Sequence, residues 1–525
     1  MRNTFTYISL AAAIMVAACF TACEKVEVST GDEVPEEIVT PAITMSVNAT
    51  KVGETKALSD DGSAITSTWT QNDEVEVWNS DGTTKYGTIT AQNSGPSTRL
   101  SGTLDSTPSD GESLQLKYLS PNYSTQDGTL TGSATSIDKV CDYAEATVTA
   151  TVAGGSVTTN DAAFTSQQAI LKLNLKSDGN VDITSDVRQL TVTLGGQTVT
   201  VDRSTPAAGP VYVAVPAASG SIVFYAAKGK YLYTKSVSKT LTAGHLYPVN
   251  LSMSTVEGAL SGLFSVSASK KVYFSKGNLR AYFATAGTSH TWDFADKQFN
   301  AIGNDAANNA INGDGSVSTG GKWVDLFGWS TASTTYGINN STTASDYSGD
   351  FRDWGTNAIT NGGNMASIWR TLGNDEWKYL FVTRASGSTV NGTSDARYTH
   401  AAIIVNEGTN GAKGIILFPD GVTIDGSEAD SWGTINGNSN WDTKCSIGQW
   451  EALEAKGCVF LPAAGYRTGT DASSTFGYFG KYWSSTPTND DYAYSISFES
   501  NQLGVYNHTD YRHFGISVRL VRDAN

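Results

Sequence analysis

Charged residues are scarce in this chain, and positively charged ones are the scarcest. Only 16% of the 525 residues are charged, and 35 Lys and Arg stand against 51 Asp and Glu, for a formal net charge of −16. Nucleic-acid binding requires clusters of Lys and Arg that neutralise phosphates, and electrostatic adhesion to an anionic bilayer requires the same surplus. The composition therefore argues against both kinds of partner.

Cysteines and catalytic motifs are also few. Two of the five cysteines lie near the N-terminus, which leaves Cys141, Cys445 and Cys458, an odd number that makes a poor disulfide framework. Cys445 and Cys458 either pair or remain as buried thiols. The chain has no HExxH, P-loop or GxSxG motif and no zinc-like cysteine spacing. We therefore expect no enzyme, no metal and no cofactor.

The N-terminal apolar stretch, Tyr7 to Ala18, is too short to span a membrane and has the length of a signal peptide. It leads into "VAACFTAC", and a small residue directly before Cys is the pattern of a bacterial lipoprotein signal. We expect a signal peptide at 1–22, lipid attachment at Cys23 (alternatively Cys19) and an acidic linker at 23–40. The protein would then be exported to the outer membrane or cell surface and contact the membrane only through its lipid.

Glycine is abundant, with 52 residues, and Asp-Gly turn signals recur between short runs of Val, Thr, Ile and Tyr. This pattern is typical of an all-β protein. In "NDEVEVWNSDGTTKYGTITA", Val75 and Val77 alternate with Glu74 and Glu76 before a hairpin turn at Asp81-Gly82. Residues 41–255 fit two β-sandwich halves, at about 41–160 and 161–255.

Within this region "TWTQNDEVEVW", "YGTITAQ", "SGTL", "YSTQDGTL" and "LTAGHLYPVNLSM" resemble the fimbrillin family of Gram-negative pilus proteins. The resemblance implies two transthyretin-like β-sandwiches, a lipid anchor and assembly with other pilus subunits by strand exchange. Strand exchange is physically reasonable, because an unpaired sheet edge exposes donors and acceptors that a neighbouring strand satisfies.

The composition changes near Thr255, and ten of the twelve tryptophans follow residue 290. Helices are predicted at "LGNDEWKYLF" (372–381) and at "SIGQWEALEAKG", where Ser446 and Gln449 form a capping box and Gly457 ends the helix. "VYFSKGNLR", "VDLFGWS", "WRTLGNDEW", "VFLPAAGYR", "FGKYWSST" and "GISVRLV" resemble the C-type-lectin-like fold, in the branch that includes formylglycine-generating enzymes. The expected fold is thus mainly β with an α+β C-terminal domain at 256–525. The late reactive cysteine pair of those enzymes is absent.

The last 45 residues combine aromatic and hydrogen-bonding side chains. "AYSISF" (493–498) and "ISVRLV" (516–521) read as strands, the latter half-buried with Ser517 and Arg519 on its outer face. The loops before and between them would be displayed on a rigid scaffold. Tyr, Asn, Asp and His there are typical of binding surfaces. The expected ligand-binding residues are Asn489, Asp490, Asp491, Tyr492, Tyr506, Asn507, His508, Asp510, Tyr511 and His513.

The function expected from these features is that of a lipid-anchored fimbrial adhesin, at the pilus tip or as an accessory subunit. Its ligand would be a host or microbial protein or glycan. One alternative is a structural or anchor subunit with no ligand of its own, and another is a non-catalytic sugar-binding lipoprotein. The late loops also resemble the variable proteins of diversity-generating retroelements, which a near-copy of the 482–521 coding segment in flanking DNA would reveal.

Overall fold

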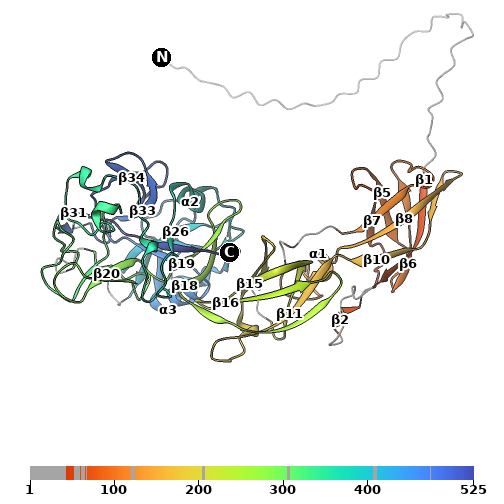
Figure 1. The fold of residues 1–525 in the computed structure, drawn as a ribbon, viewed down its shortest axis with the longest axis horizontal. Helices are drawn as coiled ribbons and strands as arrows, with labels where there is room; N and C mark the ends of the chain where they lie inside the picture. Colours follow the sequence, from red (N-terminus) through yellow and green to blue (C-terminus); the bar gives the residue numbers. More distant parts are fainter. Residues whose placement is uncertain are drawn as a thin grey trace, which may run out of the picture. The chain divides into compact units, whose positions relative to one another are not determined.

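The computed structural model describes residues 43–52, 59–60, 65–66, 68–119, 123, 126–203, 207–303, 308–405, 411–472 and 475–524. The expected signal peptide (1–22), the expected acidic linker (23–40) and both candidate lipid-attachment residues, Cys23 and Cys19, lie outside these ranges. Within them the chain is mainly β, as the sequence predicts (Figure 1). None of the helices in the described ranges combines the length and apolar character needed to cross a bilayer.

Residues 43–166, called here the first sandwich, enclose one core within a single sheet. The strand order is β10-β1-β6-β5-β4-β7-β8-β9, and pairings of β10 with β8 and of β1 with β9 close the sheet on itself. Val75 and Val77 are fully buried as their alternation predicts, and Gly82 adopts the positive φ of the predicted turn. The elements are β1 (Ile43–Val52), β2 (Ser59–Asp60), β3 (Ile65–Thr66), β4 (Glu74–Asn79), β5 (Lys85–Ala91), β6 (Ser97–Leu104), β7 (Ser113–Tyr118), α1 (Ile137–Val140), β8 (Ala144–Ala153), β9 (Ser156–Thr159) and β10 (Ala162–Ser166).

Residues 168–252, the second sandwich, form two sheets that share one core. The three strands β14-β11-β17 contribute Leu171 and Leu173, and the strands β13-β12-β15-β16 contribute Val192 and Phe224. Alternating apolar residues on both sheets therefore form one buried interior. The strands are β11 (Gln168–Lys176), β12 (Gln189–Leu194), β13 (Gln197–Asp202), β14 (Val211–Pro216), β15 (Ala218–Lys228), β16 (Tyr231–Leu241) and β17 (Leu246–Ser252).

Strand β18 (Ser254–Ser265) pairs with β16 of the second sandwich and with β19 of the residues that follow. One eight-stranded sheet, β13-β12-β15-β16-β18-β19-β37-β23, therefore runs from the second sandwich into the C-terminal region, residues 254–524. The composition change near Thr255 thus falls at the start of a strand that both regions share.

The C-terminal region combines short strands with two α-helices. Its elements after β18 are β19 (Lys271–Ser275), β20 (Leu279–Phe283), β21 (Thr291–Phe294), β22 (Lys322–Val324), β23 (Arg370–Thr371), α2 (Asn374–Lys378), β24 (Thr389–Val390), β25 (Thr393–Ser394), β26 (Tyr398–Ile404), β27 (Ala412–Leu417), β28 (Thr423–Ile424), β29 (Thr443–Ser446), α3 (Ile447–Ala455), β30 (Val459–Pro462), β31 (Arg467–Thr468), β32 (Asp471–Ala472), β33 (Gly480–Pro487), β34 (Tyr492–Glu499), β35 (Gln502–Gly504), β36 (Thr509–Tyr511) and β37 (Leu520–Asp523).

Both predicted helices are present. In α3 the Ser446 side chain accepts a hydrogen bond from the Gln449 N–H at 3.3 Å, and the Gln449 side chain accepts one from the Ser446 N–H at 2.8 Å. The helix α2 continues as one π turn over Tyr379–Thr383. The capping-box pattern is therefore confirmed in geometry.

The last predicted strand differs from expectation. Only its end is strand, as β37, and Ser517 and Arg519 are as fully buried as Ile516. Arg519 lies inward because its guanidinium donates to the Gln298 side chain at 2.8 Å and to the Phe460 carbonyl at 3.3 Å. The prediction of a half-buried strand with a polar outer face was wrong, since both faces pack against the domain.

Candidate ligand-binding surface

The late-loop surface is built on the antiparallel pair β34 and β36. Their register places Tyr492 opposite Tyr511 and Ala493 opposite Asp510. The tip of the β33–β34 hairpin (488–491) and the turn at 512–514 are therefore brought to one end of this strand pair, and the loop at 505–508 enters β36 at its other end. We use the name late-loop surface for the residues Asn489, Asp490, Asp491, Tyr492, Tyr506, Asn507, His508, Tyr511 and His513.

The hairpin tip is shaped by Asn489. Its side-chain oxygen accepts hydrogen bonds from the backbone N–H groups of Asp491 and Tyr492, both at 2.9 Å. This side-chain turn leaves Asp490 and Asp491 exposed beside the aromatic residues. The tip thus presents two carboxylates on a locally fixed backbone.

Aromatic rings join the hairpin tip to the final turn. The ring centroids of Tyr492 and Tyr511 are 4.3 Å apart, and the ring of His513 stacks on Tyr511 at 5.2 Å. Phe514 packs edge-on against Tyr511 and stacks on Tyr466 at 5.5 Å. A hydrogen bond between the two tyrosine hydroxyls raises the pKa of Tyr492 to about 12. The rings therefore form one contiguous cluster whose outer member, Tyr511, is 41% exposed.

The loop at 505–508 carries the most exposed aromatic residue of the surface. Tyr506 is 68% exposed, and Asn507 adopts a left-handed φ of 53°, which asparagine tolerates better than most residues. Lys378 of α2 donates a hydrogen bond to the Asn507 side chain at 3.2 Å. The loop is thus tied to a helix while Tyr506 points into solvent.

Asp510 does not lie on the surface, although the sequence placed it among the binding residues. It is 4% exposed, pairs with Lys481 and accepts a hydrogen bond from the Ser495 hydroxyl at 2.7 Å. Ser495 also contacts the His508 ring nitrogen Nδ1 at 2.8 Å. Alternation explains the difference, because Asp510 and Tyr511 project to opposite faces of β36. Asp510 supports the surface from below.

Sequence reasoning missed the residues that hold the surface in place. Arg512 is 3% exposed, and its guanidinium donates to the carbonyls of Tyr347 and Gly349 at 3.2 and 3.1 Å and lies over the ring of Trp329. Its backbone N–H donates to the Asp491 carbonyl at 2.8 Å. No local pattern signals this role, because the acceptors lie more than a hundred residues away in the chain.

The Ser495, His508 and Asp510 side chains lie together without forming a nucleophile relay. In a serine hydrolase, one histidine nitrogen faces the serine and the other faces the carboxylate. Here the Ser495 hydroxyl contacts both His508 Nδ1 and the Asp510 carboxylate, so the carboxylate bypasses the imidazole. The arrangement is that of a hydrogen-bonded cluster in which Ser495 and Asp510 are buried and His508 is half-buried.

The cysteines of the described residues are buried, and none of them forms a disulfide. Cys445 and Cys458 are unpaired thiols, which decides between the two alternatives that the sequence left open. Burial raises the pKa of the Cys445 and Cys141 thiols to about 12, and it raises the pKa of Cys458 as well. Such thiols are poor nucleophiles. Among the residues the structure describes, no group of three or more His, Cys, Asp or Glu side chains is arranged to hold a metal ion.

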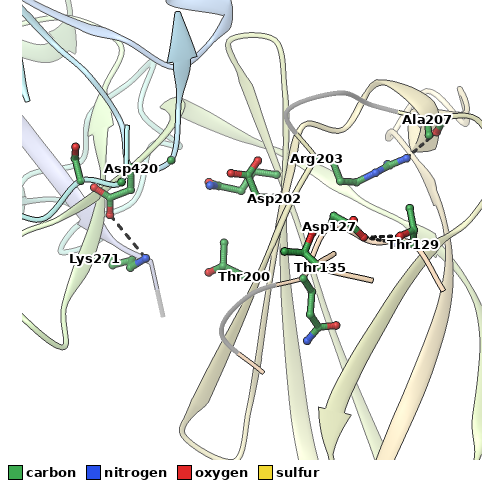
Figure 2. Close-up of a pocket in the computed structure, with 14 residues that line it drawn as sticks. Asp127, Thr129, Thr135, Thr200, Asp202, Arg203, Ala207, Lys271 and Asp420 are labelled. Atoms are coloured by element: carbon green, nitrogen blue, oxygen red, sulfur yellow. Dashed lines mark hydrogen bonds and ion pairs between the residues drawn. The ribbon is translucent and has the colours of Figure 1, made fainter. Parts of the chain in front are cut away.

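A cleft of about 690 Å³ is lined by the segment 126–135, by the second sandwich and by the C-terminal region (Figure 2). Its charged side chains are already engaged in structural contacts. Asp127 accepts from Thr129 at 2.6 Å, Arg203 donates to the Ala207 carbonyl at 2.7 Å, and Asp420 pairs with Arg384 at 2.9 Å. The cleft therefore offers fewer uncommitted groups than the late-loop surface.

Comparison with known proteins gives a family match to part of the chain. A domain of unknown function, DUF8237, matches residues 436–521 and so contains the whole late-loop surface. No curated protein matches the chain.

Solved structures that resemble the chain come from adhesion and pilus proteins. A fimbrial protein from Bacteroides ovatus is 10% identical, with 92% of this chain and 99% of that one covered and a TM-score of 0.22. A candidate cell adhesion protein from Bacteroides uniformis is 15% identical over 40% and 96%, with a TM-score of 0.23. The minor pilin GBS52 of Streptococcus agalactiae is 9% identical over 41% and 97%, with a TM-score of 0.20. TM-scores this low do not indicate a shared function.

Proposed function

We propose that this protein is a surface-displayed adhesin that binds a host or microbial protein or glycan through the late-loop surface. The observation that carries this proposal is that exposed aromatic rings stand directly beside buried, hydrogen-bonded residues that hold them in place. Tyr506 and Tyr511 are 68% and 41% exposed, while Asp510 and Arg512 directly beside Tyr511 are 4% and 3% exposed.

Such a surface suits recognition because its side chains are already held in place and need little further ordering when a ligand binds. Tyrosine offers a large amphipathic contact area with few rotatable bonds. The stacking of Tyr511 on Tyr492 and His513, and the hydrogen bonds of Arg512 below, hold these rings before any ligand arrives. A preorganised surface loses less conformational entropy on binding than a mobile one.

The proposal includes a place for the protein in a pilus. Lipid attachment at Cys23, or at Cys19, would anchor it to the outer membrane, and strand exchange through a sandwich would join it to other subunits. In that arrangement a C-terminal region added to pilin-like sandwiches favours a tip or accessory position, where a binding surface is free to meet its ligand.

The test replaces single exposed tyrosines in the full chain and measures binding to a panel of immobilised glycans and extracellular-matrix proteins. Tyr506→Ala and Tyr511→Ala should each weaken binding by at least about tenfold, the usual effect of losing an aromatic anchor. Tyr231→Ala is the matched control, because Tyr231 is 53% exposed in the second sandwich and should leave binding unchanged.

Fibre assembly is measured on the same variants. Normal assembly with lost binding supports the adhesin. If the variants no longer assemble into fibres but bind the ligands as wild type does, the structural or anchor subunit would be favoured instead. Equal binding by wild type and both late-loop variants would show that the ligand is bound elsewhere.

A further inference from the structure

A lysine and an aspartate lie side by side in the interior of the first sandwich. The Lys51 side chain is 2% exposed and that of Asp142 is 1% exposed, and Lys51 Nζ lies 3.8 Å from Asp142 Oδ2. Both groups are thus removed from water, which normally stabilises the charges of such a pair. Burial of two ions is costly unless their environment compensates for the lost hydration.

The surroundings of this pair are aromatic. Lys51 Nζ lies 4.1 Å from the ring centroid of Trp69 and 3.9 Å from that of Tyr118, and those two centroids are 5.6 Å apart. Trp69 is 1% exposed and packs edge-on against Phe164 at 5.1 Å. The rings therefore cover adjacent sides of the amine, and little of the Lys51 side chain reaches water.

The backbone fixes the two side chains at neighbouring positions. Lys51 on β1 pairs in parallel with Phe164 on β10, and β10 pairs with β8 through Ser166 and Ala144. Asp142 lies two residues before β8. Lys51 is therefore placed by a hydrogen-bonded strand, and Asp142 lies in the short segment between α1 and β8.

We propose that Lys51 and Asp142 are joined by an intramolecular amide bond between Nζ and Cγ. The geometry favours this reaction, because Lys51 Nζ lies 3.8 Å from Oδ2 of the carboxyl group that contains Cγ. Rotation about the lysine side-chain bonds can bring Nζ to the distance of about 3–3.5 Å at which reacting atoms meet. In an apolar interior the neutral amine and neutral carboxyl group are favoured relative to the separated ions. A proton passed from the ammonium group to the carboxylate produces both reactants at once.

The bond forms by condensation and needs no oxidant or other reactant. The Nζ lone pair attacks Cγ, the C–N bond forms, and the carboxyl C–O(H) bond breaks. The departing hydroxyl takes a second proton from Nζ and leaves as water. The product is a neutral secondary amide, which no longer carries the two buried charges.

Such a bond would tie the first described strand to the residue that precedes β8. It would close a loop that runs from residue 51 to residue 142, and β1 could not leave its sheet while the bond is intact. Strand exchange between subunits would then have to use a strand other than β1. The inference does not depend on the adhesin proposal, because it concerns only the interior of the first sandwich.

Peptide mapping of the purified, folded full chain by mass spectrometry tests the bond directly. We expect a tryptic species in which the peptides containing Lys51 and Asp142 are covalently linked, with a mass about 18 Da below their sum because one water is lost. Trypsin should not cut after Lys51 in this species. Lys51→Met should abolish the linked species, and Asp142→Asn should give a loss of about 17 Da, since ammonia leaves in place of water.

Lys85→Met provides the matched control. Lys85 Nζ lies closer to its carboxylate partner, 2.7 Å from Glu76 Oε1, but those side chains are 37% and 43% exposed. This variant should retain the Lys51–Asp142 species, and no linked Lys85–Glu76 species should appear. Recovery of the Lys51 and Asp142 peptides only as separate species from folded wild-type protein would overturn the proposal and leave a buried ion pair.

Discussion

The first sandwich and the C-terminal region provide hydrogen-bond partners for their buried backbone groups in different ways. In the first sandwich, eight strands pair in one closed sheet, and the core between them is largely aliphatic. The C-terminal region has many two- and three-residue strands and long connections that pass over its cores. Backbone groups in such connections need partners that a sheet would otherwise provide.

Tryptophan side chains supply some of these hydrogen-bond partners in the C-terminal region. Buried indole N–H groups donate to backbone carbonyls outside their own strands or turns: Trp329 to Ser484 at 3.0 Å, Trp354 to Tyr336 at 2.7 Å, Trp369 to Gly362 at 2.8 Å and Trp483 to Phe327 at 2.7 Å. Each ring fills the core and satisfies a connection at the same time. The difference explains why tryptophan is concentrated after residue 290.

Buried arginines also donate hydrogen bonds to backbone carbonyls of these connections. The guanidinium of Arg467 is fully buried and donates to the carbonyls of Gly469, Leu326 and Asn339 at 2.5, 3.2 and 3.0 Å. Burial lowers the pKa of Arg467 to about 10. One side chain therefore holds three separate connections, which a sheet would achieve only with several paired residues.

The largest effect that would test this comparison is expected from Arg467→Met. The substitution keeps the aliphatic stem but leaves buried carbonyls without donors, so the C-terminal region should lose about 3 kcal/mol or more of its free energy of unfolding. Denaturant unfolding followed by tryptophan fluorescence measures it, because ten of the twelve tryptophans follow residue 290.

Arg352→Met is the control for that substitution. Arg352 is exposed, and its guanidinium lies 4.2 Å above the ring of Tyr336. Its loss should cost less than about 1 kcal/mol. Equal costs for the two variants would show that the buried arginine network does not stabilise the region.

A smaller effect is expected from pH, and it should also separate the two regions. Burial lowers the pKa of His290, His400, His508 and His513 below the ordinary value of 6.5, and all four lie in the C-terminal region. The unfolded chain then binds protons more readily than the folded one, so stability is fully present above about pH 6.5 and declines as the pH falls below it.

The first sandwich contains no histidine. Thermal unfolding should therefore show a lower midpoint for the C-terminal region at about pH 5.5 than at about pH 7.5, by a few degrees per kcal/mol lost. His400→Phe should reduce this shift, because His400 is fully buried, whereas His245→Phe, at an exposed position, should not. A midpoint that does not change with pH would contradict the prediction.

The same contrast explains what the sequence could predict. Alternation places Val75 and Val77 inside because a strand's two faces are set by local geometry alone. The capping box at Ser446 is likewise local. Arg512 and Arg519 were not predicted as buried, because their acceptors are contributed by residues far away in the chain.

The late-loop surface contains residues whose exposure the sequence predicted correctly and one whose exposure it did not. The exposed Tyr506 and Tyr511 match the expectation of displayed aromatic residues, although their role in binding stays a prediction. Asp510 was placed on the surface because a list of polar residue types does not reveal on which face of β36 each one lies. Its partner Lys481 comes from β33, and only the pairing of β33 with β34 brings it near.

The smallest expected effect concerns the capping box of α3, which the sequence predicted. Ser446→Ala removes the acceptor of the Gln449 N–H at the start of α3, and the usual cost of losing such a cap is about 1 kcal/mol. Gln449→Ala removes the reciprocal contact to the Ser446 N–H and should cost less, because water can reach this half-buried backbone group. Denaturant unfolding of both variants measures the difference. If Ser446→Ala destabilised the C-terminal region as much as Arg467→Met, local capping rather than the long-range network would dominate its stability.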